Sequence, residues 1–562
     1  MSTNPLFLVL LISAISFFKL SAQSSYIPVS NKDYYHLIDR FEIKSQESIP
    51  PLHLSAKPIS RQTIGSLTDS LSNDSSLSPK DKFNLAYIQN DNNEWALAPN
   101  SRSNKPILKY FYTQKSDFFS HSDSVFDLHI NPVLYFSAGA ITSPSQRTFI
   151  NTRGLELRGS VNRKVGFYAF LTDNQAIFPQ YVYDYPGFSN TFGIGAPGEG
   201  YTKRFKKNGV DFITARGYIT FSLTKNIQAQ FGHDKNFIGN GYRSLILSDF
   251  SSNYTFLKIN TKVWKLNYQN IFAELTADVF YLNKLLPKKY LAFHHLSYNV
   301  TKNLNIGIFE SVIIGRRDSI GGSRFDVGYL NPIIFYRSIE QQNGSEDNAM
   351  LGMDFKYKFL KHFSLYGQIV LDEFLLSHIK ARDGWWGNKQ ALQLGLKYID
   401  VVGIKNLDLQ LEGNIVRPFT YSHKDNYTAY THFNQALAHP LGANFYEAIG
   451  ILRFQPLNRL NLTGKIIYAK IGMPDSTENT GTNIFLSYNT RPKNKELGYD
   501  LAGPNSYNLT IVSATASYML KHNLFIDAVL LTRSMESKKM SNSMVQYSLA
   551  LRWNIPQRIH EF

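Results

Sequence analysis

From about residue 124 onward, apolar and polar residues alternate one by one along runs of about ten residues. In the stretch NAMLGMDFKYKFL, Leu351, Phe355 and Phe359 fall on one face. Asp354 and Lys356 fall on the other. Such a run is longer than a typical soluble strand of about 5–6 residues, and it matches a tilted strand that crosses a bilayer. The pattern therefore predicts strands with one face toward lipid and the other toward water.

Short polar or basic turns join these runs in pairs. Eight such turns lie near Arg163–Lys164, Lys225–Asn226, Lys262, Lys302–Asn303, Lys361–His362, Lys405–Asn406, Asn458–Arg459 and Lys521–His522. With one further run at each end, the pattern predicts eighteen strands, an even number that puts both ends of a bacterial barrel on one side of the membrane. The connections on the other side are longer, and we place them at 175–208, 234–252, 313–348, 373–388, 416–444 and 472–504.

Short turns on one side and long loops on the other are typical of outer-membrane barrels. We therefore predict an all-β fold over residues 121–562, a transmembrane antiparallel outer-membrane β-barrel of about 18 strands with its short turns in the periplasm. A large soluble β-propeller is the alternative, but its blades would repeat at about 40–50 residues with similar lengths. The unequal connections favour the barrel, which would lie in the cell outer membrane and contact outer-membrane lipid.

Residues 1–22 are predicted to be a signal peptide. The apolar run from Leu6 to Phe18 is 13 residues long, which is shorter than a transmembrane helix of about 20 residues. The first five residues contain no Lys or Arg, a departure from the usual signal pattern, and a buried core helix is the alternative. The chain has no cysteine, so disulfides, thiolate metal sites and a lipid anchor on cysteine are excluded.

Residues 23–120 show helical rather than alternating spacing. Tyr34, Ile38 and Phe41 share one helical face. In the stretch SPKDKFNLAYIQ, Ser78 is placed as an N-cap and is followed directly by proline. We predict a small helical periplasmic segment of two or three amphipathic helices, with a partly ordered tail as the alternative.

The formal net charge is +16, and we interpret the Lys and Arg residues as spread singly along the chain. An excess of positive charge can indicate nucleic acid or an anionic surface as a partner. Nucleic-acid binding, however, requires a clustered basic patch. We therefore predict no nucleic-acid partner.

The long connections are rich in aromatic residues that lie beside hydrogen-bonding side chains. IFPQYVYDYPGF holds five aromatic rings, RDGWWGNK holds two tryptophans, and YSHKDNYTAYTHF holds four aromatic rings. Aromatic rings beside polar groups suit sugars, which have apolar faces and hydroxyl edges. The residues that we predict to contact a polysaccharide are Tyr181, Tyr183, Tyr185, Arg382, Asp383, Trp385, Trp386, Tyr427 and Tyr430. An aromatic girdle at the membrane interface is an equal alternative for the first stretch, whereas flanking charges favour a loop role for the tryptophans.

The sequence predicts no catalytic residue and no metal site. Asp372, Glu373 and Glu310 could form an acid–base pair, but Asp372 and Glu310 alternate onto strand faces, which favours a charged network in the lumen. The stretch GHDKNFIGNGYRSL lacks the complete phosphate-loop pattern. Adjacent His294 and His295 would face opposite sides of a strand. We therefore predict a protein that is not an enzyme and that uses no cofactor.

Seven longer stretches carry a resemblance to a known family: DYYHLIDRFEIKS, KPISRQTI, GHDKNFIGNGYRSLILSDFSSNYTFLKI, RFDVGYLNPIIFYRSIE, DNAMLGMDF, LYGQIVLDEF and WWGNKQALQLGLKY. In them the chain resembles the Wzi family of capsule-assembly outer-membrane proteins, and especially RemB-like gliding-motility proteins of the Bacteroidetes type. The resemblance implies an eighteen-stranded barrel with a helical periplasmic segment. It also implies a non-enzymatic role in holding surface polysaccharide or in supporting gliding, with gliding or secretion machinery as further partners.

An outer-membrane channel for solute or polymer transport is the alternative function. Inward charges such as Asp354, Lys356 and Glu412 could line an open pore, or they could pair with one another into a plug. A membrane-embedded hydrolase is a third hypothesis, for which Asp372 would be the residue to test.

Overall fold

The computed structural model describes residues 24–45, 52–97, 101–142, 145–185, 194–277, 286–315, 325–333, 335–343, 347–473, 478–538 and 540–562. The predicted signal peptide, residues 1–22, lies outside the described residues. None of the described helices is both long and apolar enough to cross a membrane.

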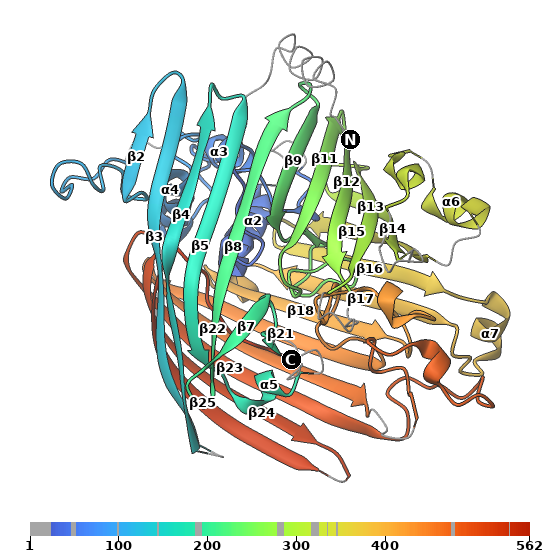
Figure 1. Cartoon of the computed structure of the whole chain (residues 1–562). Helices are drawn as coiled ribbons and strands as arrows, with labels where there is room; N and C mark the ends of the chain where they lie inside the picture. The colour runs from blue at the N-terminus through green and yellow to red at the C-terminus, as the bar shows by residue number, and fades with distance from the viewer. Residues whose placement is uncertain are drawn as a thin grey trace.

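Eighteen antiparallel strands form a closed barrel (Figure 1), which confirms the predicted fold and strand number. In chain order they are β3 (Phe126–Thr142), β4 (Ser145–Val161), β5 (Val165–Ile177), β8 (Gly209–Ser222), β9 (Ile227–Asp234), β11 (Tyr254–Val263), β12 (Leu266–Thr276), β13 (Lys288–Asn299), β14 (Leu304–Ile314), β15 (Asn348–Phe359), β16 (Phe363–Glu373), β17 (Lys389–Tyr398), β18 (Leu407–Val416), β21 (Phe445–Leu457), β22 (Leu460–Gly472), β23 (Ser506–Lys521), β24 (Leu524–Glu536) and β25 (Ser541–Trp553). The last strand pairs with the first, from Gln546 opposite Ile141 to Trp553 opposite Leu134. The wall therefore closes on itself without a free edge.

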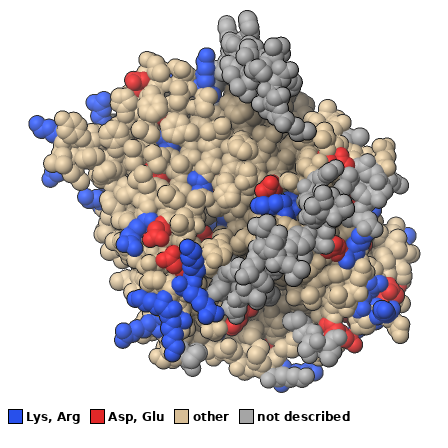
Figure 2. Space-filling view, in the orientation of Figure 1, with Lys and Arg blue, Asp and Glu red and all other residues tan. Residues whose placement is uncertain are grey.

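The alternation places apolar side chains on the outer face of the wall and polar side chains in the lumen. Exposed apolar side chains include Leu155, Leu171, Ile213, Leu392, Leu411, Ile466, Val512 and Leu549. Buried polar and charged side chains include Asp354, Lys356, Gln368, Gln393, Lys397, Gln410, Glu412 and Glu447. Figure 2 shows one face of the wall, on which uncharged residues cover most of the area. This arrangement, the inverse of a soluble protein, fits a wall that stands in lipid.

The short turns lie at one end of the barrel, as predicted, with one shift in position. The turn predicted near Lys262 lies at Trp264 and Lys265, between β11 and β12. The connections at the opposite end are unequal: residues 537–540 join β24 to β25, whereas residues 417–444 join β18 to β21. We call these two ends the short-turn end and the loop end.

The predicted helices form inside the short-turn end of the barrel. They are α2 (Lys32–Lys44), α3 (Arg61–Ser70) and α4 (Pro79–Asp91). In Figure 1 they lie behind β4, β5 and β8, within the ring of strands. Ser78 and Asp81 close a capping box at the start of α4, which satisfies backbone N–H groups that have no partner within the helix. The apolar faces of the three helices meet in one cluster that includes Ile38, Phe41, Ile64, Leu67 and Ile88. We call residues 24–45 and 52–97 the helical plug.

Charged side chains dock the helical plug on the barrel. Arg40 of α2 is 1% exposed and donates hydrogen bonds to Asp81 of α4 and to Asp400 and Asp408 of the barrel. Lys44 also pairs with Asp81 and Asp400. Burial alone would raise the pKa of Asp81, but Arg40 and Lys44 outweigh burial and hold that pKa well below its ordinary range. The docking of the plug therefore depends on ionised carboxylates.

Two connections from the loop end fold into the lumen. Residues 235–253 include β10 (Phe237–Ile238), and residues 417–444 include η3 (Asn426–Thr428), β19 (Thr431–His432) and β20 (Gln435–Ala436). β10 pairs with β1 (Ala56–Lys57) of the helical plug. An inward loop and the plug therefore meet inside the barrel. The remaining elements are β2 (Phe119–Ser122), α5 (Gln180–Tyr183), β6 (Ile194–Gly195), β7 (Tyr201–Phe205), η1 (Val327–Leu330), α6 (Tyr336–Asn343), α7 (Leu376–Ala381), η2 (Val401–Gly403) and η4 (Tyr488–Thr490).

Glu310 faces outward, so its predicted place in the lumen is wrong. It shares the outer face of β14 with Ile308, which is 50% exposed. Its carboxylate accepts hydrogen bonds from the backbone N–H groups of Tyr336 and Arg337 at the start of α6. Asp372, by contrast, is buried and pairs with a lysine, as the prediction of a charged network required. Alternation alone does not reveal that a connection folds back over the outer wall and supplies partners that lipid lacks.

Replacing Arg40 with methionine (Arg40→Met) should loosen the helical plug by about 3–5 kcal/mol, because it leaves buried carboxylates without their partner. Hydrogen exchange of α2 and α4 in the folded barrel would measure this free energy.

Since the pKa of Asp81 is depressed, the contribution of its ion pairs is present above the ordinary carboxyl pKa of about 3.9 and is lost as the pH falls below it. In the wild type, α2 and α4 should therefore lose protection in acid. For the substitution, Lys82→Met on the exposed side of α4 is the control. Equal protection of α2 and α4 in Arg40→Met and in Lys82→Met would contradict the expected role of Arg40.

Candidate functional site

The last residues of the chain return into the lumen after β25. Asn554 has a left-handed backbone conformation, with φ at 54°, and its side chain donates a hydrogen bond to the carbonyl of Pro132. In Figure 1 the C-terminus lies within the ring of strands, near α5. We call residues 555–562 the C-terminal tail.

Side chains, rather than a strand ladder, hold the C-terminal tail. The carboxylate of Glu561 accepts hydrogen bonds from Lys465 Nζ, at 2.6 Å, and from the hydroxyl of Tyr242. Phe562 is 8% exposed and packs edge-on against the rings of Tyr181 and Tyr185. The C-terminal tail belongs to no strand, so it fills the lumen without forming part of the wall.

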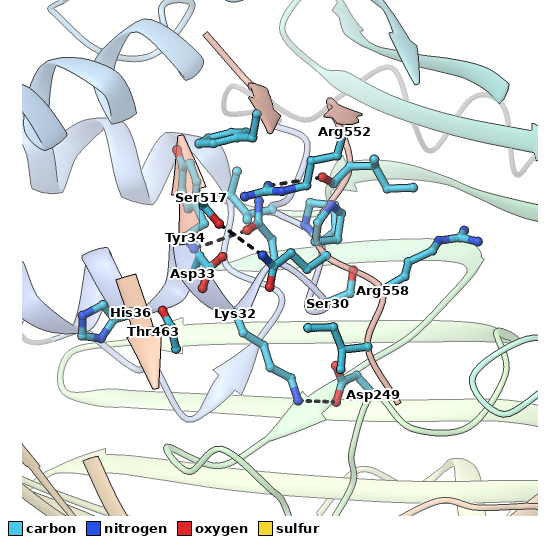
Figure 3. A pocket seen from close by; sticks show the side chains of 18 of the residues that line it. Ser30, Lys32, Asp33, Tyr34, His36, Asp249, Thr463, Ser517, Arg552 and Arg558 are labelled. Carbon is cyan, nitrogen blue, oxygen red and sulfur yellow. Dashed lines mark hydrogen bonds and ion pairs between the residues drawn. The ribbon is translucent and has the colours of Figure 1, made fainter. Parts of the chain in front are cut away.

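A cavity of about 430 Å³ remains between the helical plug, the C-terminal tail and the strands β22–β25. In Figure 3 its lining comes from four parts of the chain: Lys32 of α2, Asp249 of the inward connection 235–253, Thr463 and Ser517 of the wall, and Arg558 of the tail. Lys32 points to Asp249, with 4.0 Å between its Nζ and the carboxylate. The lining contains eleven Lys and Arg side chains and seven Asp and Glu side chains. The lining of this cavity mixes polar and apolar side chains with an excess of basic ones, and segments of the chain itself bound it on several sides.

Tyr181, Tyr183 and Tyr185, which we predicted to contact polysaccharide, pack inward on the connection from β5 to β8. Tyr181 donates to the carbonyl of His560 at 2.7 Å, and Tyr183 donates to the carbonyl of Asn208 at 2.9 Å. Tyr185 is 8% exposed. These tyrosines therefore contact the C-terminal tail and their own loop, and they offer little surface to a ligand in this conformation.

Trp385 and Trp386 lie together at the loop end, and other side chains cover their faces. Trp385 stacks on His378 with ring centroids 4.8 Å apart. Gly387 lies against the same indole, so closely that a Cβ at that position would clash with it. The guanidinium of Arg491 lies 3.9 Å from the centroid of Trp386. Both tryptophans are half-buried, so it is mainly their edges that reach solvent.

Arg382 and Asp383 frame the tryptophan pair. Arg382 is exposed and ends α7 with φ at 53°. Asp383 accepts hydrogen bonds from the His378 ring at 2.6 Å and from the backbone N–H of Trp385. The hydrogen bond from His378 lowers the pKa of Asp383. Among the predicted residues, Arg382, Asp383, Trp385 and Trp386 thus come together at one accessible place.

Tyr427 and Tyr430, the last two predicted contacts, lie in the inward connection 417–444. Both side chains are 0% exposed. Tyr430 donates to the carbonyl of Ile246 at 2.9 Å, which ties the two inward connections together. A sugar could reach these two rings only after this connection had moved.

The C-terminal tail and its contacts were not predicted from the sequence. Its residues, IPQRIHEF, lack alternation, and Pro556 is the one signal that the last strand has ended. Within the described residues, no group of three or more His, Asp or Glu side chains is placed to hold a metal ion.

The closed antiparallel wall, apolar outside and polar inside, defines an outer-membrane β-barrel. Among solved structures, the chain is similar to Wzi of Escherichia coli, described as an outer-membrane protein involved in group 1 capsule assembly and as a carbohydrate-binding β-barrel. The two share 16% identity with a TM-score of 0.58, over 95% of this chain and 100% of that chain. At this identity the similarity shows the fold alone.

Two further similarities are weaker. The outer-membrane protein OprD of Pseudomonas aeruginosa matches with 11% identity and a TM-score of 0.41, over 76% of this chain and 94% of that chain. OccAB4 of Acinetobacter baumannii matches with 9% identity and a TM-score of 0.39, over 75% and 97%. Both scores are too low to carry an argument. No family model matches the chain, and no curated protein is similar to it in sequence.

Replacing Glu561 with glutamine (Glu561→Gln) should loosen the C-terminal tail, because Lys465 then loses its buried ionic partner. A hydrogen bond to a charged group contributes about 1.5–3 kcal/mol, so we expect carboxypeptidase to release Phe562 about tenfold faster or more. Glu536→Gln, at the exposed end of β24, is the matched control. Identical release from Glu561→Gln and the wild type would show that the tail is held by other contacts.

Proposed function

We propose that this outer-membrane barrel is a non-enzymatic anchor that holds surface polysaccharide at its loop end. The observation that carries the proposal is the filling of the lumen. The helical plug, two inward connections and the C-terminal tail occupy much of the lumen and leave a cavity of about 430 Å³ between them and the wall. A barrel whose interior is filled in this way presents its loops to the exterior and offers no wide aqueous path.

Contacts across the lumen support an interior that stays closed. Lys356 donates to Glu42 of α2 at 2.7 Å, and Lys397 pairs with Asp39 of the same helix. Near the loop end, the backbone N–H of Ser248 donates to the carbonyl of Leu437 at 2.8 Å. Two lysines that would line an open pore, Lys356 and Lys397, are therefore paired with the helix that fills it.

The surface around Arg382, Asp383, Trp385 and Trp386 is our proposed contact with the polysaccharide. Glu496 accepts a hydrogen bond from the indole N–H of Trp386 and pairs with Arg491 at 2.8 Å. These groups supply aromatic edges, hydrogen-bond donors and carboxylates within one patch, a combination that suits sugar hydroxyls. The covered ring faces mean that a sugar would contact edges and polar groups, or would displace Arg491.

The resemblance to the Wzi family supports a capsule or exopolysaccharide as the ligand, and the fold agrees with that of a carbohydrate-binding barrel. Support of gliding motility, together with gliding or secretion machinery as partners, is a further part of the proposal and rests on the RemB-like resemblance alone. A channel is the competing function, and the lumen is where the two differ.

Titrating the refolded barrel with exopolysaccharide from its own cells should quench tryptophan fluorescence in a saturable way. We expect Trp385→Ala and Trp386→Ala to weaken the apparent affinity about tenfold, because an aromatic contact contributes about 0.5–1.5 kcal/mol beyond its buried area. Trp264→Ala, at the short-turn end and 78% exposed, is the matched control and should bind like the wild type. No quenching at any concentration would remove direct polysaccharide binding.

The purified protein should give no steady conductance in planar bilayers, because segments of the chain enter its lumen from both ends. A general porin reconstituted in parallel would confirm that channels can be detected. Stable steps of uniform size from this protein would favour the channel over the anchor.

A further inference from the structure

Four basic residues cluster at the loop end, two of them in β7 and two in the turn that joins β7 to β8. Lys203, Arg204, Lys206 and Lys207 are all exposed, and we call them the basic rim. Figure 2 shows a group of Lys and Arg side chains at its lower left, where β4, β5 and β8 meet the loop end. The expectation from the sequence that basic residues are spread singly is therefore wrong here, since TKRFKKN holds four of them within five positions.

The basic rim has few acidic neighbours. Among the described residues, none of its four side chains forms an ion pair within 4.0 Å, whereas other exposed cations of the loop end do: Lys288 pairs with Glu274, and Lys495 pairs with Glu478. In the described pairing of β7 with β8, Asp211 is the one carboxylate that lies opposite a rim residue, and that residue is Lys203. The basic rim is therefore a local excess of positive charge.

The position of the basic rim relative to the apolar wall indicates which kind of partner it can contact. Lys203 lies opposite Asp211, and Ile213, two residues further along the same face of β8, is 65% exposed. Phe205 contacts Phe149 of β4, with ring centroids 6.4 Å apart. Aromatic rings of this kind mark the boundary between hydrocarbon and headgroups in barrels. The basic rim thus lies where the lipid-facing wall ends, on the loop side.

We propose that the basic rim binds the phosphate groups of lipids in the outer leaflet. Lysine and arginine at the edge of a hydrocarbon belt extend toward headgroup phosphates, and arginine can bind phosphate through two parallel hydrogen bonds. Arg147 of β4, also exposed, adds a cation near Phe149. An acidic polysaccharide is a different partner for the same charge. The lateral position beside Ile213 and Phe205 favours a lipid, because a polymer above the membrane would approach the top of the loops.

The proposal goes beyond polysaccharide anchoring and does not depend on it. Its test uses the full chain purified in neutral detergent, with diphosphorylated lipid A as the probe and native mass spectrometry as the readout. The wild type should retain lipid A. The fourfold variant Lys203→Gln, Arg204→Gln, Lys206→Gln, Lys207→Gln should bind it at least tenfold more weakly, since each cation near a charged surface contributes about 1 kcal/mol. Lipid A without its phosphates should bind weakly to both proteins.

A matched control removes the same number of charges from the short-turn end. The variant Arg163→Gln, Lys164→Gln, Lys225→Gln, Lys302→Gln changes four exposed residues there, and it should retain lipid A like the wild type. If the fourfold rim variant does not fold, the double variant Lys206→Gln, Lys207→Gln, confined to the turn, serves instead and should bind severalfold more weakly.

Three results would overturn the proposal. The first is equal retention of lipid A by the wild type and a folded rim variant. The second is an equal loss in the short-turn control, which would indicate a nonspecific effect of net charge. The third is a rim variant with unchanged lipid binding but weakened polysaccharide quenching, which would assign the basic rim to the polymer. A rim variant that loses lipid A binding but keeps polysaccharide quenching would support lipid binding by the basic rim. The same result would leave the proposed anchor function unaffected.

Discussion

The structure depends on the pairing of β25 with β3. In lipid, no water is present to satisfy an unpaired backbone N–H or C=O group, so an open sheet edge would cost several kcal/mol for each such group. The antiparallel ladder from Gln546 opposite Ile141 to Trp553 opposite Leu134 removes that edge. Because this closing pair is antiparallel, like every other neighbouring pair of the wall, the ring must contain an even number of strands.

Closure also creates an interior, and the chain fills it with its own polar segments. A buried ion costs several kcal/mol to desolvate unless it has partners. Arg40 meets three carboxylates, and Glu561 meets Lys465 and Tyr242. The lumen is therefore held by ion pairs and hydrogen bonds that join distant parts of the sequence. The same pairs are the physical reason for preferring an anchor to a channel.

The two surfaces that we propose as binding sites lie at the loop end, outside the lipid-facing part of the wall. The tryptophan pair is built from two connections, because Trp386 contacts both Arg491 and Glu496 of the neighbouring loop. The basic rim lies at the end of the lipid-facing wall. One surface points outward from the membrane and the other sideways along it, so the two can serve different partners on one rigid frame.

The sequence by itself determined the wall and the plug helices, because both depend on local spacing. Leu351 and Asp354 lie on the faces that the period of two assigned to them, and Ser78 caps α4 as its neighbours predicted. Only the tertiary structure decided what meets those faces. Glu310 on the outer face has polar partners because the start of α6 donates to it, and Tyr430 is buried because two connections enter the lumen. Alternation specifies the side of a strand, whereas contacts between residues hundreds of positions apart depend on how the closed barrel places its loops, its plug and its tail.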